Sequence, residues 1–248
     1  MEHPFLRNEM LWAPEAQARL RSAHVLLLGL GGVGSYAAEC LARSGIGKLT
    51  LVDSDTVALS NINRQLIALE STLGRPKVEV AKERVLQINP ACRVEARQLF
   101  FTPESAGEVG FSQYDYVADA IDTVTGKLEL IRRCREAGVP VISCMGTGNK
   151  LDPTAFRVTA MEKTSGCPLA RVMRRELKKR GITGVKAVWS PEEPLAPAPS
   201  PDDQKGTAGR PTPGSMAFVP SAAGLILAGE IVKDLLGETL RKGGERHG

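Results

Sequence analysis

The fold of this 248-residue chain is decided by the stretch Leu26-Leu27-Leu28-Gly29-Leu30-Gly31-Gly32-Val33-Gly34-Ser35. An apolar run enters a G-x-G-x-x-G turn, and the turn opens a helical pattern through Ala37, Cys40 and Leu41. Glycine lets the backbone turn tightly and approach a phosphate, and the free N–H groups of a first helical turn bind anions. The stretch therefore predicts a nucleotide site between a strand and a helix.

Strand and helix patterns alternate along the chain. Strands are predicted at 25–28, 49–52, 93–99, 116–121 and 141–144, and helices at 35–44, 76–88 and 125–137. After Gly148 the pattern predicts a strand at 155–161, a helix at 168–180, a strand at 185–189 and a closing helix at 221–236. This order is typical of an α/β fold, a Rossmann-like, doubly wound, mainly parallel sheet, here with a mixed C-terminal extension.

Composition predicts one domain that spans residues 1–248. A chain of this length with 42% hydrophobic residues can bury one large core, and the sequence contains no internal repeat. Seven of the 16 prolines fall at 191–213, among Asp, Ser, Gly and Thr. Residues 191–214 are therefore expected to form a mobile proline-rich loop, either a variable insertion or a lid over the nucleotide site.

The sequence also bears on cellular location. Its first residues lack the apolar region of a signal peptide, and the apolar run at 222–229 is too short to span a bilayer. Its five cysteines include no C-x-x-C pair and do not form the pattern of a disulfide framework. We therefore expect a cytoplasmic protein without a membrane span.

Asp53 ends the predicted strand at 49–52, and an acid at this place takes the ribose hydroxyls in dinucleotide-binding folds. The glycine loop and Asp53 alone would therefore also suit an NAD-dependent dehydrogenase. Arg64 and Lys77 favour ATP, because fixed cations match the negative charge of a triphosphate and of its leaving pyrophosphate. Hydride transfer to nicotinamide has no use for two such cations beside the phosphates.

Five motifs in this order resemble the ubiquitin-activating enzyme superfamily, whose bacterial members adenylate carboxylates. They are Gly29-x-Gly31-Gly32-Val33-Gly34-Ser35, Asp53-Ser54-Asp55-Thr56-Val57, Ser60-Asn61-x-Asn63-Arg64-Gln65, Gly74-x-Pro76-Lys77-Val78-Glu79 and Asp119-Ala120-Ile121-Asp122. The resemblance implies a single adenylation domain that uses ATP and Mg²⁺. It disfavours a non-catalytic nucleotide-binding relative, because all of the expected phosphate and metal residues are present.

The resemblance also implies a role for each residue. The implied nucleotide-binding set comprises Gly29, Gly31, Gly32, Gly34, Asp53, Asp55, Asn61, Arg64, Gln65 and Lys77, with Asp53 on the ribose and the last four residues around the phosphates. The implied catalytic residues are Arg7, Arg64, Lys77 and Asp122. Asp122 would hold the metal, because Mg²⁺ prefers hard oxygen ligands and often takes only one or two protein carboxylates. Asp122 could instead cap the helix predicted to follow it, or it could serve both roles.

Further motifs resemble the tRNA threonylcarbamoyladenosine dehydratases within that superfamily. They are Gly45-Ile46-Gly47, Gln87-Ile88-Asn89-Pro90-x-Cys92-x-Val94, Lys150-Leu151-Asp152-Pro153-Thr154, Pro168-Leu169-Ala170-Arg171 and Phe218-Val219-Pro220-Ser221. The resemblance implies adenylation of the threonylcarbamoyl carboxylate on tRNA, followed by ring closure. The alternative is an adenylyltransferase that activates the C-terminus of a ubiquitin-like sulfur-carrier protein, although such enzymes commonly carry two C-x-x-C pairs. A sulfur-carrier or cysteine-desulfurase-system partner stays open.

A tRNA substrate requires a surface that binds RNA. The net charge of +4 and the pI of about 8.8 are mildly favourable. The helix predicted at 168–180 carries a basic stripe of Arg171, Arg174, Arg175, Lys178 and Lys179. Such a stripe suits phosphate contacts, but it could also be an ordinary solvated face.

Arg7 is expected to take part in assembly, and Cys167 is a candidate for the chemistry. The segment around Arg7 resembles the N-terminal region in which superfamily relatives place an arginine into the partner's ATP site, which implies a homodimer. Cys167 precedes a predicted helix, where a thiolate would be stabilised, so it is a candidate nucleophile. A partly buried structural cysteine is the alternative that we favour.

Overall fold

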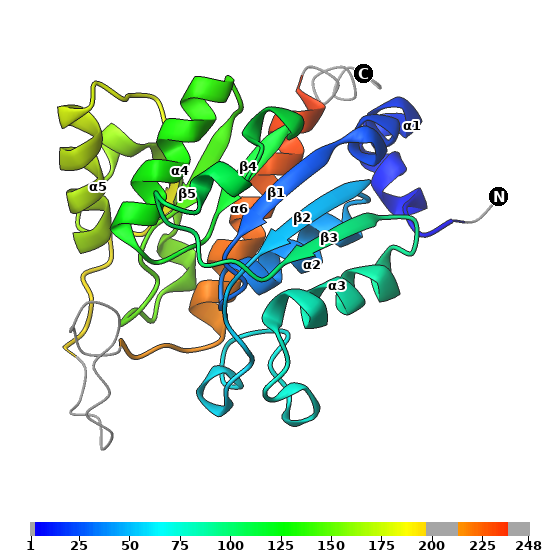
Figure 1. Cartoon of the computed structure of the whole chain (residues 1–248), viewed down its shortest axis with the longest axis horizontal. Coiled ribbons are helices and arrows are strands. Elements are labelled where there is room, and N and C mark those ends of the chain that lie inside the picture. The colour runs from blue at the N-terminus through cyan, green and yellow to red at the C-terminus, as the bar shows by residue number, and fades with distance from the viewer. Residues whose placement is uncertain (1–2, 197–212, 238–248) are drawn as a thin grey trace, which may run out of the picture.

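A seven-stranded sheet forms the centre of the structure, a computed structural model that describes residues 3–196 and 213–237 (Figure 1). In chain order the strands are β1 (His24–Leu28), β2 (Lys48–Val52), β3 (Arg93–Arg97), β4 (Tyr116–Asp119), β5 (Val141–Cys144), β6 (Arg157–Ala160) and β7 (Lys186–Trp189). Across the sheet their order is β3-β2-β1-β4-β5-β7-β6. All neighbours are parallel except β6 and β7. The predicted Rossmann-like fold with a mixed extension is confirmed.

Helices cover both faces of the sheet (Figure 1). They are α1 (Leu6–Ser22), α2 (Gly34–Arg43), α3 (Lys77–Ile88), α4 (Val124–Ala137), α5 (Pro168–Lys179) and α6 (Phe218–Leu236). Alternate residues of β1 face the two sides. Val25 and Leu27 join the core shared with α2 and α6, whereas Leu26 and Leu28 join the core shared with α4. All four are fully buried, as expected for a parallel strand covered on both faces.

Some elements differ from the sequence-based expectation. Helix α1 was not expected, and its pattern is broken because Ala13 has a φ of 70° directly before Pro14, which kinks the helix. β4 ends at Asp119 rather than at residue 121, because the Asp119 carboxylate accepts the amide of Ile121 (3.2 Å) and turns the chain out of the sheet. β3 and β6 are also shorter than predicted, and α6 begins earlier, at Phe218.

The sequence also predicted a mobile loop at 191–214 and no membrane span. Residues 197–212 of the predicted proline-rich loop lie outside the described residues, so its mobility stays a prediction. Within 3–196 and 213–237, no helix combines the length and the apolar content needed to cross a membrane.

An ion pair joins Lys127 of α4 to Asp119 at the end of β4 (Nζ to Oδ1, 3.0 Å), and both side chains are fully buried. Lys127 Nζ also donates to the carbonyl oxygen of Cys144 (2.8 Å) and to Ser143 Oγ (3.3 Å). Ser143 Oγ in turn donates to Asp119 Oδ2 (2.5 Å). One buried polar cluster therefore connects β4, β5 and α4.

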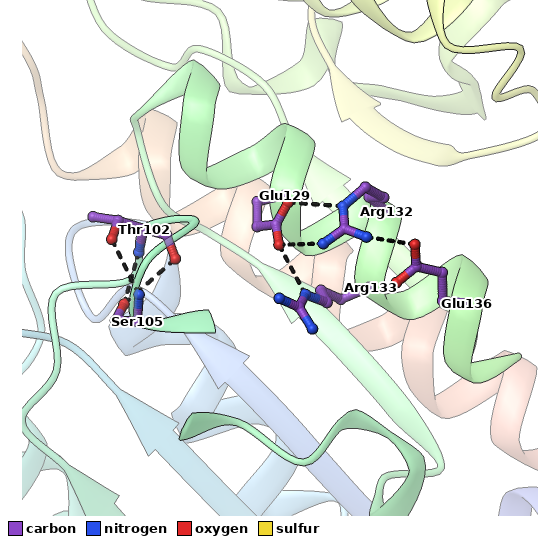
Figure 2. A network of polar contacts seen from close by, with 6 residues as sticks. All are labelled: Thr102, Ser105, Glu129, Arg132, Arg133 and Glu136. Atoms are coloured by element: carbon purple, nitrogen blue, oxygen red, sulfur yellow. Dashed lines mark hydrogen bonds and ion pairs between the residues drawn. The ribbon is translucent and has the colours of Figure 1, made fainter. Parts of the chain in front are cut away.

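We expect Lys127→Met to lower the free energy of unfolding by about 3–5 kcal/mol, because the Asp119 carboxylate would stay buried without its cation. Arg132→Met is the matched control on the same helix. Arg132, whose side chain is 40% exposed, pairs with Glu129 and Glu136 (Figure 2), and ion pairs that reach solvent contribute about 1 kcal/mol or less. Urea titrations at neutral pH measure both losses. Equal losses would show that burial does not set the cost of breaking these pairs.

Candidate functional site

A cavity of about 430 Å³ opens at the carboxyl ends of β1, β2 and β4. β1 and β4 are neighbours in the sheet but not in the chain, and doubly wound sheets bind ligands at such a switch point. The cavity is lined by the predicted residues Gly29, Gly31, Gly32, Asp53, Asp55, Asn61, Arg64, Gln65, Lys77 and Asp122. The structure thus brings together residues that the sequence spreads over five motifs.

Two glycines shape the loop between β1 and α2. Gly29 has a φ of 88°, and a Cβ there would lie 2.6 Å from the carbonyl oxygen of Ala120. A Cβ on Gly34 would lie 1.7 Å from the carbonyl oxygen of Gly29. Gly34 was predicted to contact the nucleotide, but it does not line the cavity. Its lack of a side chain instead allows close packing inside the turn. The compact loop aims the first turn of α2 at the cavity, where its free N–H groups can meet an anion.

Asp53 follows β2 and fixes the neighbouring loops. Its Oδ2 accepts the amide of Leu30 in the glycine loop (2.6 Å), and its Oδ1 accepts the amide of Asp55 (2.8 Å). Burial raises the pKa of Asp53, although the nearby charge of Lys77 and the two amides oppose that rise. The carboxylate is therefore oriented by backbone donors at the cavity wall, where a ribose hydroxyl could meet it.

Two cations reach the cavity from different elements. Lys77 begins α3, and its buried Nζ pairs with the exposed carboxylate of Asp55 (2.9 Å). Arg64 lies in the segment after β2 and donates from Nη1 to the carbonyl oxygen of Ser60 (2.7 Å) and to Asn63 Oδ1 (2.9 Å). Burial lowers the pKa of Arg64. A partly desolvated pair of cations is suited to a polyanionic ligand.

Two amide side chains complete this side of the cavity. Asn61 Oδ1 accepts the amide of Ala58 (3.1 Å). The buried Oε1 of Gln65 has no hydrogen-bond partner among the described residues. Because a buried polar atom without a partner costs free energy, this atom points to a polar ligand that would satisfy it.

Asp122 is an exposed carboxylate on the turn after β4. The alternative interpretation of Asp122 as a helix cap is wrong, because α4 has Thr123 as its N-cap residue. Across residues 3–196 and 213–237, no group of three or more His, Cys, Asp or Glu side chains could hold a metal by itself. A single carboxylate still fits Mg²⁺, which commonly takes its remaining ligands from water and phosphate oxygens.

Two other predicted residues, Arg7 and Cys167, do not line the cavity. Arg7 is in α1, and its neighbour Asn8 donates to the carbonyl oxygen of Arg43 (3.2 Å) at the end of α2. That is the end of the sheet opposite the glycine loop, so Arg7 cannot reach the cavity of its own chain. Cys167 is only 1% exposed, which argues against a role as an accessible nucleophile.

The predicted basic stripe lies on α5, which packs against β7 near the edge of the sheet that β6 forms. Glu176 pairs with Arg175 and Lys179 of the stripe, and Arg174 donates to Thr164 Oγ1 (2.7 Å). Only Arg171 and Lys178 of the five lack a polar partner among the described residues. Arg171, Arg174, Arg175 and Lys178 surround a second cavity of about 700 Å³, which has apolar walls that include Met161 and Ile182.

Sequence patterns did not point to Phe100, Phe101, Thr147 or Ser215, which also line the cavity, whereas the lining residue Pro220 belongs to the motif Phe218-Val219-Pro220-Ser221. Phe100 and Phe101 follow β3, so the rule that ligands bind at carboxyl ends of parallel strands could have found them. Ser215 comes from the segment that leads into α6, and no local pattern marks it, whereas Pro220 lies in the first turn of α6.

A family model described as the ThiF family matches residues 5–246. The chain belongs to the ThiF family. The predicted membership of the ubiquitin-activating enzyme superfamily is thereby confirmed.

Relatives of this chain are named for two activities. The chain is 44% identical to the tRNA threonylcarbamoyladenosine dehydratase of Bacillus subtilis over 95% of this chain and 96% of that protein. A crystal structure of the Escherichia coli tRNA N6-threonylcarbamoyladenosine dehydratase in complex with ATP is 35% identical, with a TM-score of 0.83 over 98% of this chain and 96% of that chain. The molybdopterin-synthase adenylyltransferase of E. coli is 34% identical over 70% of this chain and 67% of that protein.

Proposed function

We propose that this chain is an ATP-dependent tRNA threonylcarbamoyladenosine dehydratase. The observation that carries the proposal is the cavity itself, which gathers the glycine loop, Asp53, Arg64, Lys77 and Asp122 at one edge of the sheet. The names of the two relatives similar over nearly the whole chain support it. A tRNA substrate also supports a cytoplasmic location.

The activation of a sulfur-carrier protein is the second candidate. Relatives named molybdopterin-synthase adenylyltransferase support it, but they match a smaller share of this chain. The sequence also lacks the C-x-x-C pairs that are common in such enzymes. A sulfur-carrier or cysteine-desulfurase-system partner stays a prediction.

The cavity residues suit transfer of an adenylyl group. A substrate carboxylate oxygen attacks the α-phosphorus of ATP, and pyrophosphate leaves as the P–O bond breaks. Lys77, Arg64 and the N–H groups of the glycine loop stabilise the charge on the phosphates. Asp122 would hold Mg²⁺, which supplies further charge compensation at the phosphate oxygens.

Ring closure follows on the same carbon. An internal nucleophile of the threonylcarbamoyl group attacks the activated carbonyl carbon, and AMP leaves with the carboxylate oxygen. This step needs no enzyme thiol. Burial raises the pKa of Cys92 to about 11 and that of Cys134 and Cys144 to about 12, so these thiols stay protonated.

The function is tested by the products of the reaction. With ATP, Mg²⁺ and tRNA that carries threonylcarbamoyladenosine, the protein should release AMP and pyrophosphate in equal amounts with the cyclised nucleoside. Mass spectrometry of tRNA nucleosides from cells lacking the protein should show that this nucleoside is lost. Release of ADP and phosphate would contradict adenylation. Pyrophosphate release with a sulfur-carrier protein, but not with tRNA, would favour the second candidate.

We also propose that the working form is a homodimer in which Arg7 acts in the partner's cavity. Arg7 lies at the end of the sheet opposite its own nucleotide cavity, so only a second chain could bring it to one. A cation supplied by a partner stabilises transition-state charge in the manner of an arginine finger.

Mixing two inactive variants tests this arrangement. We expect Arg7→Ala and Asp122→Ala each to lose most of the activity. After random exchange of chains, mixed dimers should contain one complete site and restore about a quarter of the wild-type activity. A mixture no more active than its components would contradict the assignment of Arg7 to the partner's site.

We propose that the exposed face of α5 contacts tRNA phosphates. Arg171 and Lys178 are exposed and lie about two helical turns apart beside the second cavity. Arg171 and Lys178 have no side-chain polar partner within residues 3–196 and 213–237 and so can neutralise phosphates, whereas Arg175 and Lys179 already pair with Glu176.

We expect the double variant Arg171→Glu/Lys178→Glu to weaken tRNA binding and to lower the slope of log Kd against log salt by about 2, because two phosphate contacts are lost. ATP binding should not change. The control Lys82→Glu/Arg135→Glu reverses the same charge on α3 and α4. If both variants weaken tRNA binding equally, the effect is one of net charge and α5 is not the contact surface.

A further inference from the structure

Two asparagines hold the segment that leads into α6 against the nucleotide cavity. Asn63 Nδ2 donates to the carbonyl oxygen of Ser215 (3.0 Å). Asn149 Oδ1 accepts the amide of Gly214 (2.7 Å), and the amide of Asn149 donates to the carbonyl oxygen of Gly214 (2.8 Å). In Figure 1 the orange segment before α6 lies at the same end of the sheet as the cyan segment after β2. The dipeptide Gly214-Ser215, which reaches the cavity through Ser215, is therefore fixed from both sides.

Asn149 adopts a backbone conformation that suits these contacts. Its φ of 59° lies in the left-handed region, which asparagine tolerates better than most other residues. Its carbonyl oxygen accepts the amide of Leu195 (2.7 Å), so one residue contacts both described segments that flank residues 197–212. A Cβ on the preceding Gly148 would lie 2.8 Å from Pro213 Cβ, so the two segments approach closely there.

Asn63 extends this set of contacts to a cation. Its Oδ1 accepts from Arg64 Nη1 (2.9 Å), while its Nδ2 is the donor to Ser215. Rotation of the amide would lose both bonds, because the oxygen cannot donate and the nitrogen cannot accept. The orientation of Asn63 is therefore set by Ser215, and the orientation of Arg64 is set in part by Asn63.

We propose that Asn63 is a positioning residue that sets Arg64 for ATP, and that Asn149 and the Gly214-Ser215 dipeptide hold Asn63 in place. The inference rests on the proposed function, because it takes ATP as the ligand of Arg64. In this arrangement the segment before α6 contributes to nucleotide binding because it holds Asn63, which in turn orients Arg64.

The affinity of the full chain for ATP, measured by titration calorimetry with Mg²⁺, tests the role of Asn63. Asn63→Ala should raise the Kd for ATP about tenfold, the loss expected when a charged donor loses one acceptor. In an Arg64→Ala background the same substitution should change the Kd by less than about twofold, because Asn63 acts through Arg64. An unchanged Kd for Asn63→Ala, or an equal rise in both backgrounds, would overturn the inference.

Asn149→Gly tests the other end of the contact. It deletes the side-chain acceptor and keeps a backbone that reaches positive φ. The Kd for ATP should rise about threefold, and this rise should vanish when residue 63 is already alanine. An unchanged Kd for Asn149→Gly, or a rise that persists with alanine at residue 63, would overturn the part assigned to Asn149.

A control separates positioning from general destabilisation. Asn89→Ala removes the bond from Asn89 Nδ2 to the carbonyl oxygen of Ile46 (3.2 Å), beyond the end of α3 that is remote from the cavity. It should lower the melting temperature and leave the Kd for ATP unchanged. If Asn63→Ala behaves in the same way, Asn63 is structural and the inference fails. If the wild-type chain does not bind ATP, the proposed function fails instead.

Discussion

The nucleotide cavity depends on the buried ion pair between Asp119 and Lys127. Asp119 turns the chain out of β4 by accepting the amide of Ile121, and the turn that follows forms the cavity wall against which Gly29 packs. A carboxylate buried at this depth without a partner costs free energy, and the ammonium of Lys127 supplies that partner and so supports the turn. Such pairs contribute little net stability, but removing one partner leaves an uncompensated buried charge.

In the structure the positive charge of Lys77 is balanced by Asp55, and a polyphosphate ligand would compete for that place. Its buried Nζ pairs with Asp55, whose side chain is 64% exposed. A phosphate group approaching Lys77 would compete with this carboxylate, which can move into water at little cost. The ammonium of Lys77 is therefore paired before a ligand binds, so no unpaired charge lies in the interior. Asp55 is the partner that a phosphate group would displace.

The sequence allowed prediction of those parts of the molecule that local pattern controls. The glycine loop, the alternation of strands and helices, and the cations after β2 follow from periodicity and motif spacing, because neighbouring residues determine them. α1 was missed because Pro14 interrupts its pattern and its kink depends on tertiary contacts. The contacts of Ser215 with the cavity, and the pairing of Glu176 with cations of α5, depend on partners that no periodicity marks.

The two edges of the sheet limit how copies of this chain can associate. β3 forms one edge, and its sequence Arg93-Val94-Glu95-Ala96-Arg97 places charged side chains at alternate positions. Charged edge strands disfavour hydrogen bonding to a strand of another molecule, because the charges would have to be desolvated or brought together. The opposite edge, β6, is four residues long and antiparallel to its neighbour. A dimer of this chain is therefore expected to form through helices and loops, and its subunits would keep separate sheets.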